Sequence, residues 1–441
     1  MKIPKRIASV LIHALKGGVV PRVGLGYVAV GREAEINALL HDVQIAEDGG
    51  AFFRFVVGKY GSGKSFLIQT MRQHVMDRGF AVADADLSPE RRLVGSAGQG
   101  LATYRELMKS LSVKASPDGG ALKLILEKWV ESVRAEVRET KGMKETNQFF
   151  DIEVERTIKR KIDALNDLVH GFDFAEVLTE FHRCYSEVDD EGAAKAVRWL
   201  RGEYSTKTEA KAAIGINAVI NDANWYDYVK LMSAFLVSAG YKGLVVMIDE
   251  LVNIMKIPNT TTRQSNYEKI LTMYNDCMQG KASHLGIIMC GTPQCIEDTR
   301  RGVFSYDALR SRLEGGRFAS GELRDMRAPI IRLEPLTYEE LTVLTEKLAE
   351  IHGILYEYEP RATLKDRLAF VKAEFERVGA NTNITPREMI RDFIELLNVA
   401  YDHPDKPLPE IMGLDEFRFI EAGDEEAFGE NIFDGFEDFK L

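Results

Sequence analysis

Cysteine is scarce in this 441-residue sequence, and its four cysteines lack the spacing of a metal-binding motif. They stand at Cys184, Cys277, Cys290 and Cys295, without a CxxC pair. Proteins built on disulfides or on structural zinc carry denser, regularly spaced cysteines. We therefore expect reduced, packed thiols in a cytoplasmic protein, with no metal bound by cysteine.

Long apolar runs are also lacking. A membrane-spanning helix needs roughly 18 or more consecutive apolar residues, and no stretch approaches that length. The N-terminus begins, like a signal peptide, with basic residues and an apolar stretch, but Arg6, His13 and Lys16 interrupt it and no small-residue cleavage site follows. We expect residues 3–16 to form an amphipathic helix of the mature protein, and no membrane partner.

Basic residues are in the minority: 57 Lys and Arg stand against 68 Asp and Glu, a net charge of −11. This argues against a protein wrapped in nucleic acid by bulk electrostatics, while a local basic groove remains open. Residues 1–32 contain no acidic residue, whereas the last 21 residues hold eight acids and four phenylalanines. The acidic tail, residues 401–441, is either a solvated end or a segment that docks on a basic surface of a subunit or partner.

Apolar, β-branched runs alternate with helical patterns along the chain. We predict strands at 51–57, 80–87, 244–248, 285–290 and 330–333, and mainly helices over about 100–240 and 337–400. Strands that alternate with helices indicate an α/β fold whose parallel sheet is covered on both faces.

The clearest motif follows the first predicted strand and opens a helix. Residues 58–65, GKYGSGKS, fit the pattern GxxxxGK[ST] in full. Glycines let the backbone N–H groups point inward around a phosphate, and the helix adds its positive N-terminal end. Lys64 would neutralise the β- and γ-phosphates of ATP, and Ser65 would ligate Mg²⁺. The alternative, a plain glycine-rich turn, fits the strand-to-helix context less well.

A second motif ends the strand LVVMI with Asp249 and Glu250. Ligands of open α/β sheets bind at the carboxyl ends of the strands, where both carboxylates should lie. We expect Asp249 to hold Mg²⁺ and Glu250 to polarise the attacking water. An acid after an apolar strand is common, so this prediction depends on the GKYGSGKS loop.

Weaker candidates follow the fourth predicted strand. Thr292 could sense the γ-phosphate or merely end the strand in a turn. Among the arginines Arg301, Arg310, Arg312 and Arg317, we expect Arg310 or Arg312 to act as an arginine finger toward a neighbouring subunit, the alternative being a solvated basic face. Arg387, which opens the last clear helix, could reach the same phosphates.

These elements, in this order, resemble AAA+ ATPases over roughly residues 30–95 and 240–400. The resemblance implies a P-loop NTPase with a parallel five-stranded sheet in the order 5-1-4-3-2 and a C-terminal helical lid. It also places Gly31, Arg32 and Glu33 near the adenine. Asn is more familiar than Thr292 at the sensing position. The predicted nucleotide-binding residues are Gly31, Arg32, Glu33, Gly58, Lys59, Tyr60, Gly61, Ser62, Gly63, Lys64, Ser65 and Phe66.

The segments GGVVPRVGLGYVAVGREAEI and FFRFVVGKYGSGKSFLIQTMRQ resemble the ATP-binding proteins of BREX-type bacterial phage-defence systems. The long separation of Lys64 from Asp249 implies a helical insertion at about 100–240. We expect a basic helix and link at 1–30, an ATPase core at 31–335 with this insertion, a lid at 336–400, and the tail.

Three functions follow from these motifs. The first is an oligomeric, Mg²⁺-dependent ATP hydrolase that couples turnover to DNA or to a helicase or other defence-system protein. The second is a slow nucleotide-dependent switch or adaptor that recruits a helicase or nuclease. The third is a DNA-binding ATPase of the initiator or transposition-regulator type, which is weakened because no winged-helix domain is evident after residue 400.

Overall fold

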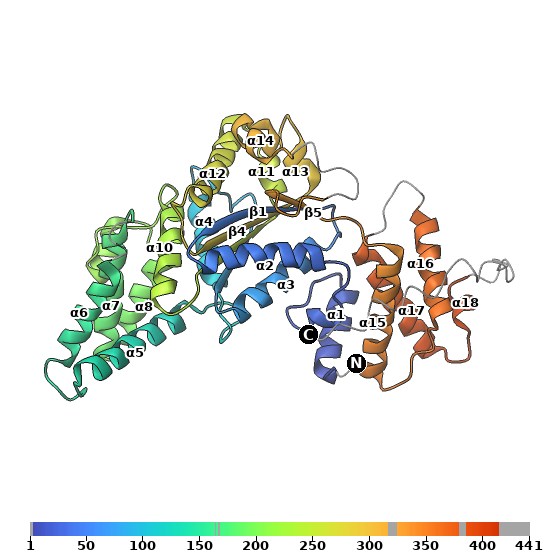
Figure 1. The fold of residues 1–441 in the computed structure, drawn as a ribbon, viewed down its shortest axis with the longest axis horizontal. Helices are drawn as coiled ribbons and strands as arrows, with labels where there is room; N and C mark the ends of the chain where they lie inside the picture. The colour runs from blue at the N-terminus through green and yellow to red at the C-terminus, as the bar shows by residue number, and fades with distance from the viewer. Residues whose placement is uncertain (1–2, 164, 166–167, 316–323, 379–384, 414–441) are drawn as a thin grey trace. The chain divides into compact units, whose positions relative to one another are not determined.

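A computed structural model describes residues 3–163, 165, 168–315, 324–378 and 385–413 (Figure 1). The chain forms two compact units. The sheet unit comprises Val20–Thr337 and Thr385–Arg387, and the helical unit comprises Met1–Val19, Tyr338–Ile384 and Glu388–Leu441. Most of the predicted acidic tail, from residue 414 onward, lies outside the described residues.

Five parallel strands form the sheet of the larger unit, each close to a predicted apolar run. They are β1 (Ala51–Val57), β2 (Ala81–Asp86), β3 (Leu244–Asp249), β4 (Leu285–Gly291) and β5 (Ile330–Arg332). The strand order is β2-β3-β4-β1-β5. This is the order that the resemblance to AAA+ ATPases implied, and the five-stranded parallel sheet is confirmed.

Helices cover both faces of the sheet, because neighbouring residues of a strand point to opposite faces. Phe52 and Val56 of β1 pack with α2 (Glu33–Glu47) and α3 (Lys64–Asp77). Phe53 and Phe55 face the other side, which is covered by α4 (Gln99–Ser110), α10 (Trp225–Ser238) and α12 (Thr260–Met278). The apolar runs therefore reflect burial on two faces.

The predicted insertion between β2 and β3 is helical, and its buried aromatic side chains belong to the same apolar core as one face of the sheet. Trp129, Phe174, Trp199 and Phe235 are at most 1% exposed, and their rings contact one another or shared neighbours. Its helices are α4 (Gln99–Ser110), α5 (Leu122–Lys141), α6 (Phe150–Asp163), α7 (Gly171–Ser186), α8 (Asp190–Leu200), α9 (Lys207–Ile214) and α10 (Trp225–Ser238).

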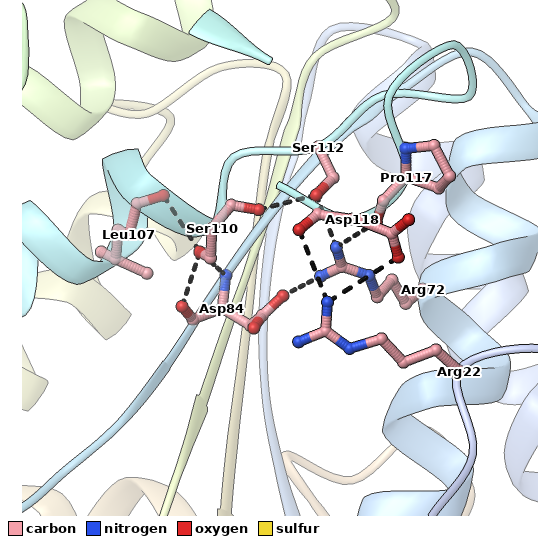
Figure 2. A network of polar contacts seen from close by, with 8 residues as sticks. All are labelled: Arg22, Arg72, Asp84, Leu107, Ser110, Ser112, Pro117 and Asp118. Atoms are coloured by element: carbon pink, nitrogen blue, oxygen red, sulfur yellow. Dashed lines mark hydrogen bonds and ion pairs between the residues drawn. The ribbon is translucent and has the colours of Figure 1, made fainter. Parts of the chain in front are cut away.

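A polar network fixes the start of this insertion to the sheet (Figure 2). The buried guanidinium of Arg72 on α3 donates to Asp84 of β2 and to the hydroxyl of Ser112. Ser112 lies in the loop that follows α4, and so does Asp118, whose carboxylate oxygen is 3.9 Å from Nη1 of Arg22. Because a buried charge is costly without partners, these contacts favour one arrangement of the loop.

Two helices follow β3: the short α11 (Val252–Met255) and the longer α12 (Thr260–Met278). The short helices α13 (Pro293–Glu297) and α14 (Asp307–Leu313) follow β4, with a 3₁₀ turn at Val303–Ser305 between them. Another 3₁₀ turn, at Leu25–Tyr27, precedes α2.

The helical unit contains the N-terminal helix together with helices from the end of the chain. It comprises α1 (Lys5–Lys16), α15 (Tyr338–Tyr356), α16 (Leu364–Val378), most of α17 (Pro386–Asp402) and α18 (Leu408–Ile411). Helix α1 packs against α15, and Lys5 forms a 2.7 Å ion pair with Glu357. The helix predicted at 3–16 is therefore confirmed, but its place among the C-terminal helices was not foreseen.

The sequence predicted packed, reduced cysteines and no membrane-spanning helix. All four cysteines are buried and free. None of the helices described combines the length and apolar character needed to cross a membrane.

The packing of α1 generates a stability prediction. Leu11 is fully buried, whereas the adjacent Val10 is 38% exposed. Leu11→Ala should lower the free energy of unfolding by about 3 kcal/mol because it removes buried methyl groups and leaves a cavity. Val10→Ala is the control and should change it little. Thermal melting of the full chain checks this, and equal melting temperatures for the two variants would contradict the packing of α1.

Candidate active site

The loop between β1 and α3 has the backbone form that the GKYGSGKS motif predicts. Gly61 and Gly63 have φ values of +78° and +93°, in the left-handed region that favours glycine. A Cβ at Gly58 would overlap the Ser62 hydroxyl. The Ser62 Oγ is buried without a hydrogen-bond partner among the described residues. The loop is thus a tight cradle with one unsatisfied polar atom inside it.

Lys64 begins α3 and folds back over this loop. Its Nζ donates to the carbonyls of Gly58 and Lys59, both at 2.8 Å, and lies 5.5 Å from the ring centroid of Tyr60. Burial lowers the pKa of Lys64, although Asp249 opposes that shift. The ammonium therefore sits in the cradle where an anion would meet it, at the positive end of α3.

The carboxylates after β3 lie against the start of α3. The Ser65 hydroxyl is 3.5 Å from Oδ2 of Asp249, and the Glu250 amide donates to Oδ1 of Asp249 at 2.7 Å. Glu250 has a φ of +61°, a left-handed conformation that is strained for a residue with a side chain. The site thus brings together Lys64, Ser65, Asp249 and Glu250, as the two motifs predicted.

Strand β4 holds both halves of the site. The Gly58 amide donates to the carbonyl of Gly291 at 3.1 Å, and the Leu251 amide donates to the carbonyl of Cys290 at 3.2 Å. A Cβ at Gly291 would clash with the thiol of Cys295 and meet Leu251. Two adjacent carbonyls at the end of one strand therefore fix the spacing of the phosphate loop and the acidic loop.

Asp86 is a third carboxylate at this edge, and sequence reasoning missed it. It ends β2 directly beside Asp249 in the parallel ladder. Burial and then Asp249 raise the pKa of Asp86, and burial, Asp249 and Asp86 in that order raise the pKa of Glu250. Asp86 could have been predicted from two observations together: it is the acid at the end of the run FAVADAD, and the expected strand order places that run beside β3.

The donor set fits Mg²⁺ only as part of a nucleotide site. Over the described ranges, no group of three or more His, Cys, Asp or Glu side chains is arranged to hold a metal ion. Mg²⁺ commonly takes one or two protein oxygens and completes its shell with water and substrate phosphates. The neighbouring oxygens of Ser65 and Asp249 provide such a partial set.

Arg32 lies against the phosphate loop, a contact that the sequence did not reveal. It is 5% exposed, and its Nη2 donates to the carbonyls of Ser62 at 3.0 Å and Glu334 at 2.9 Å. Gly31 and Glu33 flank it at the start of α2, and Phe66 lies in the first turn of α3. The nearness of Gly31, Arg32 and Glu33 to adenine stays a prediction.

Thr292 follows β4 and starts α13. Its hydroxyl accepts a hydrogen bond from the Cys295 amide at 3.4 Å, which makes it the N-cap of that helix. The side chain thus has a local structural role, and its role as a phosphate sensor stays a prediction.

The candidate finger arginines lie on or near α14. Arg310 is partly exposed and pairs at 3.3 Å with Glu314, the residue that follows α14. Arg312 donates to the Ala308 carbonyl within the same helix. Arg301 instead donates to the carbonyls of Met255 and Ile257, and Arg317 lies outside the described residues.

The start of α17 meets the phosphate loop. A Cβ at Gly61 would come within 2.7 Å of the Thr385 Cβ, and Thr385–Arg387 belong to the sheet unit. Arg387, two residues further, is exposed. Arg387 therefore lies two positions along the chain from a residue whose side chain contacts the loop, and its interaction with a phosphate stays a prediction.

Comparison with known proteins adds one match. A protein-family model described as "BREX system ATP-binding protein BrxC/D" matches residues 3–416. No curated protein matches the chain. The match covers both compact units and agrees with the resemblance carried by the segments around GRE and GKYGSGKS.

The loop geometry predicts the cost of a methyl group at Gly61. Gly61 and Gly215 both have φ of +78°, but only Gly61 has a close neighbour for an added Cβ. Gly215→Ala should cost about 1–2 kcal/mol of stability from left-handed strain alone. Gly61→Ala should lower the melting temperature further because it also displaces Thr385. Equal effects of the two substitutions would contradict this close approach.

Proposed function

The chain belongs to the BREX system ATP-binding protein family, and we propose that it is a Mg²⁺-dependent ATPase of the AAA+ class. The observation that carries this proposal is the meeting of two loops at one sheet edge. Lys64 and Ser65 of the phosphate loop lie beside Asp249 and Glu250 of the acidic loop. Both loops are bonded to β4.

The side chains have separate roles in this proposal. Lys64 would bind the β- and γ-phosphates, and Ser65 and Asp249 would hold the metal ion. Bound there, Mg²⁺ supplies positive charge that offsets the charge on the transferred phosphoryl group. Glu250, the residue after the end of β3, would orient the attacking water through its carboxylate.

Three features support the AAA+ class in particular. The strand order is the one expected for that class, and arginines lie on α14 after β4. Thr385, which directly precedes α17, lies against Gly61 of the phosphate loop, and Arg387 is the second residue of that helix. Arg310 and Arg312 both remain candidate fingers: Arg310 is partly exposed and paired with Glu314, and Arg312 is exposed and donates to the Ala308 carbonyl.

A finger on an exposed helix implies a shared site. We propose an oligomer in which Arg310 or Arg312 reaches the γ-phosphate bound to a neighbouring subunit. Membership of a BREX family supports a function in anti-phage defence, with a helicase or another defence-system protein as partner. DNA is proposed as a further partner, engaged directly or through that protein.

The roles proposed for Lys64 and Glu250 predict different defects in ATP binding and hydrolysis when each residue is replaced. Lys64→Ala should abolish hydrolysis and weaken ATP binding, because the phosphates lose their main cation. Glu250→Gln should keep ATP binding and slow hydrolysis by about 100-fold or more, since a carboxamide is a poor base. Phosphate release and fluorescent-ATP binding measure the two steps, with Lys242→Ala as an exposed control. Wild-type turnover in Glu250→Gln would remove its assigned role.

The finger proposal predicts complementation between inactive variants. Arg310→Ala and Lys64→Ala should each lose ATPase activity alone. Mixing them should restore part of it, because some interfaces combine an intact loop with an intact finger. Arg156→Ala, an exposed arginine of α6, is the control. If neither Arg310→Ala nor Arg312→Ala affects turnover, no finger acts from α14.

A further inference from the structure

A buried arginine joins the phosphate loop to the end of β5. The same nitrogen of Arg32, Nη2, donates to the carbonyls of Ser62 and Glu334. Ser62 lies between the two left-handed glycines of the loop, and Glu334 lies two residues after β5. One guanidinium therefore holds two backbone segments that are far apart in the chain.

The carboxylate of Glu35 pairs with Arg32 and is itself held by Arg324. Glu35, which is 2% exposed, lies 3.7 Å from Nη1 of Arg32 and 3.0 Å from Nη2 of Arg324. Arg324 also donates to the Arg332 carbonyl at 2.6 Å. Buried charges of this kind are stable only when each has a partner in good geometry. The set fixes the position and the orientation of the Arg32 guanidinium.

The Ser62 carbonyl matters because of the planarity of the peptide bond. In a trans peptide, the C=O of one residue and the N–H of the next point in opposite directions. A bond that holds the Ser62 carbonyl toward Arg32 therefore turns the Gly63 N–H to the other side of the same plane. Gly63 is one of the two residues of this peptide and Gly61 precedes it, so the local chain by itself would leave that direction open.

We propose that Arg32 is a positioning residue that sets the direction of the Ser62–Gly63 peptide and so pre-forms the loop for phosphate. The consequence for nucleotide rests on the proposed function, whereas the effect on the loop does not. Pre-formed amide donors need no reorganisation when an anion binds, which strengthens their interaction with it. A lysine at this position keeps the charge but loses the planar fork.

Arg54 offers a matched control. It is 7% exposed, in the same unit, and its guanidinium binds both carboxylate oxygens of Asp42. Its other bonds go to the carbonyls of Arg327 and Ala328. Arg54→Lys therefore disturbs an equally buried arginine whose described bonds do not reach the phosphate loop.

The experiment compares Arg32→Lys, Glu35→Gln and Arg54→Lys in the full chain, well below their melting temperatures. The first readout is chymotrypsin cleavage after Tyr60, which is 58% exposed on the loop, without nucleotide. The second is the affinity for fluorescent ATP. Losing a charge-assisted hydrogen bond should speed cleavage and weaken binding by about tenfold in Arg32→Lys, with a smaller effect of the same sign in Glu35→Gln. Arg54→Lys should match wild type in both.

Four results decide the proposal. Wild-type cleavage in Arg32→Lys would overturn it, and so would the same faster cleavage in Arg54→Lys. A loosened loop with unchanged ATP affinity would overturn the pre-formation of the phosphate site. If the wild-type chain binds no ATP, the proposed function fails, while faster cleavage confined to Arg32→Lys and Glu35→Gln still supports the positioning of the loop.

Discussion

The candidate site depends on the parallel pairing of β4 with β1 on one side and β3 on the other. The phosphate loop follows β1 and the acidic loop follows β3, so neither loop alone determines the distance between them. Consecutive carbonyls of Cys290 and Gly291 accept the amides of Leu251 and Gly58. Backbone bonds of this kind are rigid and independent of side-chain rotamers, which suits a site that must hold Ser65 beside Asp249.

The charges at this edge explain why a cation and an anion would bind together. The carboxylates of Asp86, Asp249 and Glu250 gather at this edge. Burial raises the pKa of Asp86, although Arg91 opposes that shift, and burial raises the pKa of Glu250, although Lys64 and Lys256 oppose it; burial also lowers the pKa of Lys64. Each of these pKa shifts indicates that burial penalises the charged form more than nearby opposite charges stabilise it. In our proposal, Mg²⁺ offsets the carboxylates and the phosphates offset Lys64. The site is therefore expected to favour the metal–nucleotide complex over either component.

Sequence reasoning located the strands and the site motifs because their signals are local. Apolar runs such as AFFRFVV are buried on both faces, and the GKYGSGKS spacing reflects the turns that its glycines make. The contacts of Arg32 with Ser62 and Glu334 could not be foreseen, since they join residues distant in the chain without any periodic pattern. Asp86 was missed for a related reason: its position beside Asp249 depends on which strand pairs with β3. The grouping of α1 with α15 likewise depends on tertiary packing.

The central claim is that this chain binds ATP through its phosphates at the edge formed by β1, β3 and β4. Calorimetric titration of the full chain with ATP and with adenosine, each in the presence of MgCl₂, tests it most directly. The account predicts one ATP per chain and much weaker binding of adenosine, because adenosine lacks the phosphates that the loop would bind. Equal affinities for ATP and adenosine, or no binding of ATP at millimolar concentration, would contradict it.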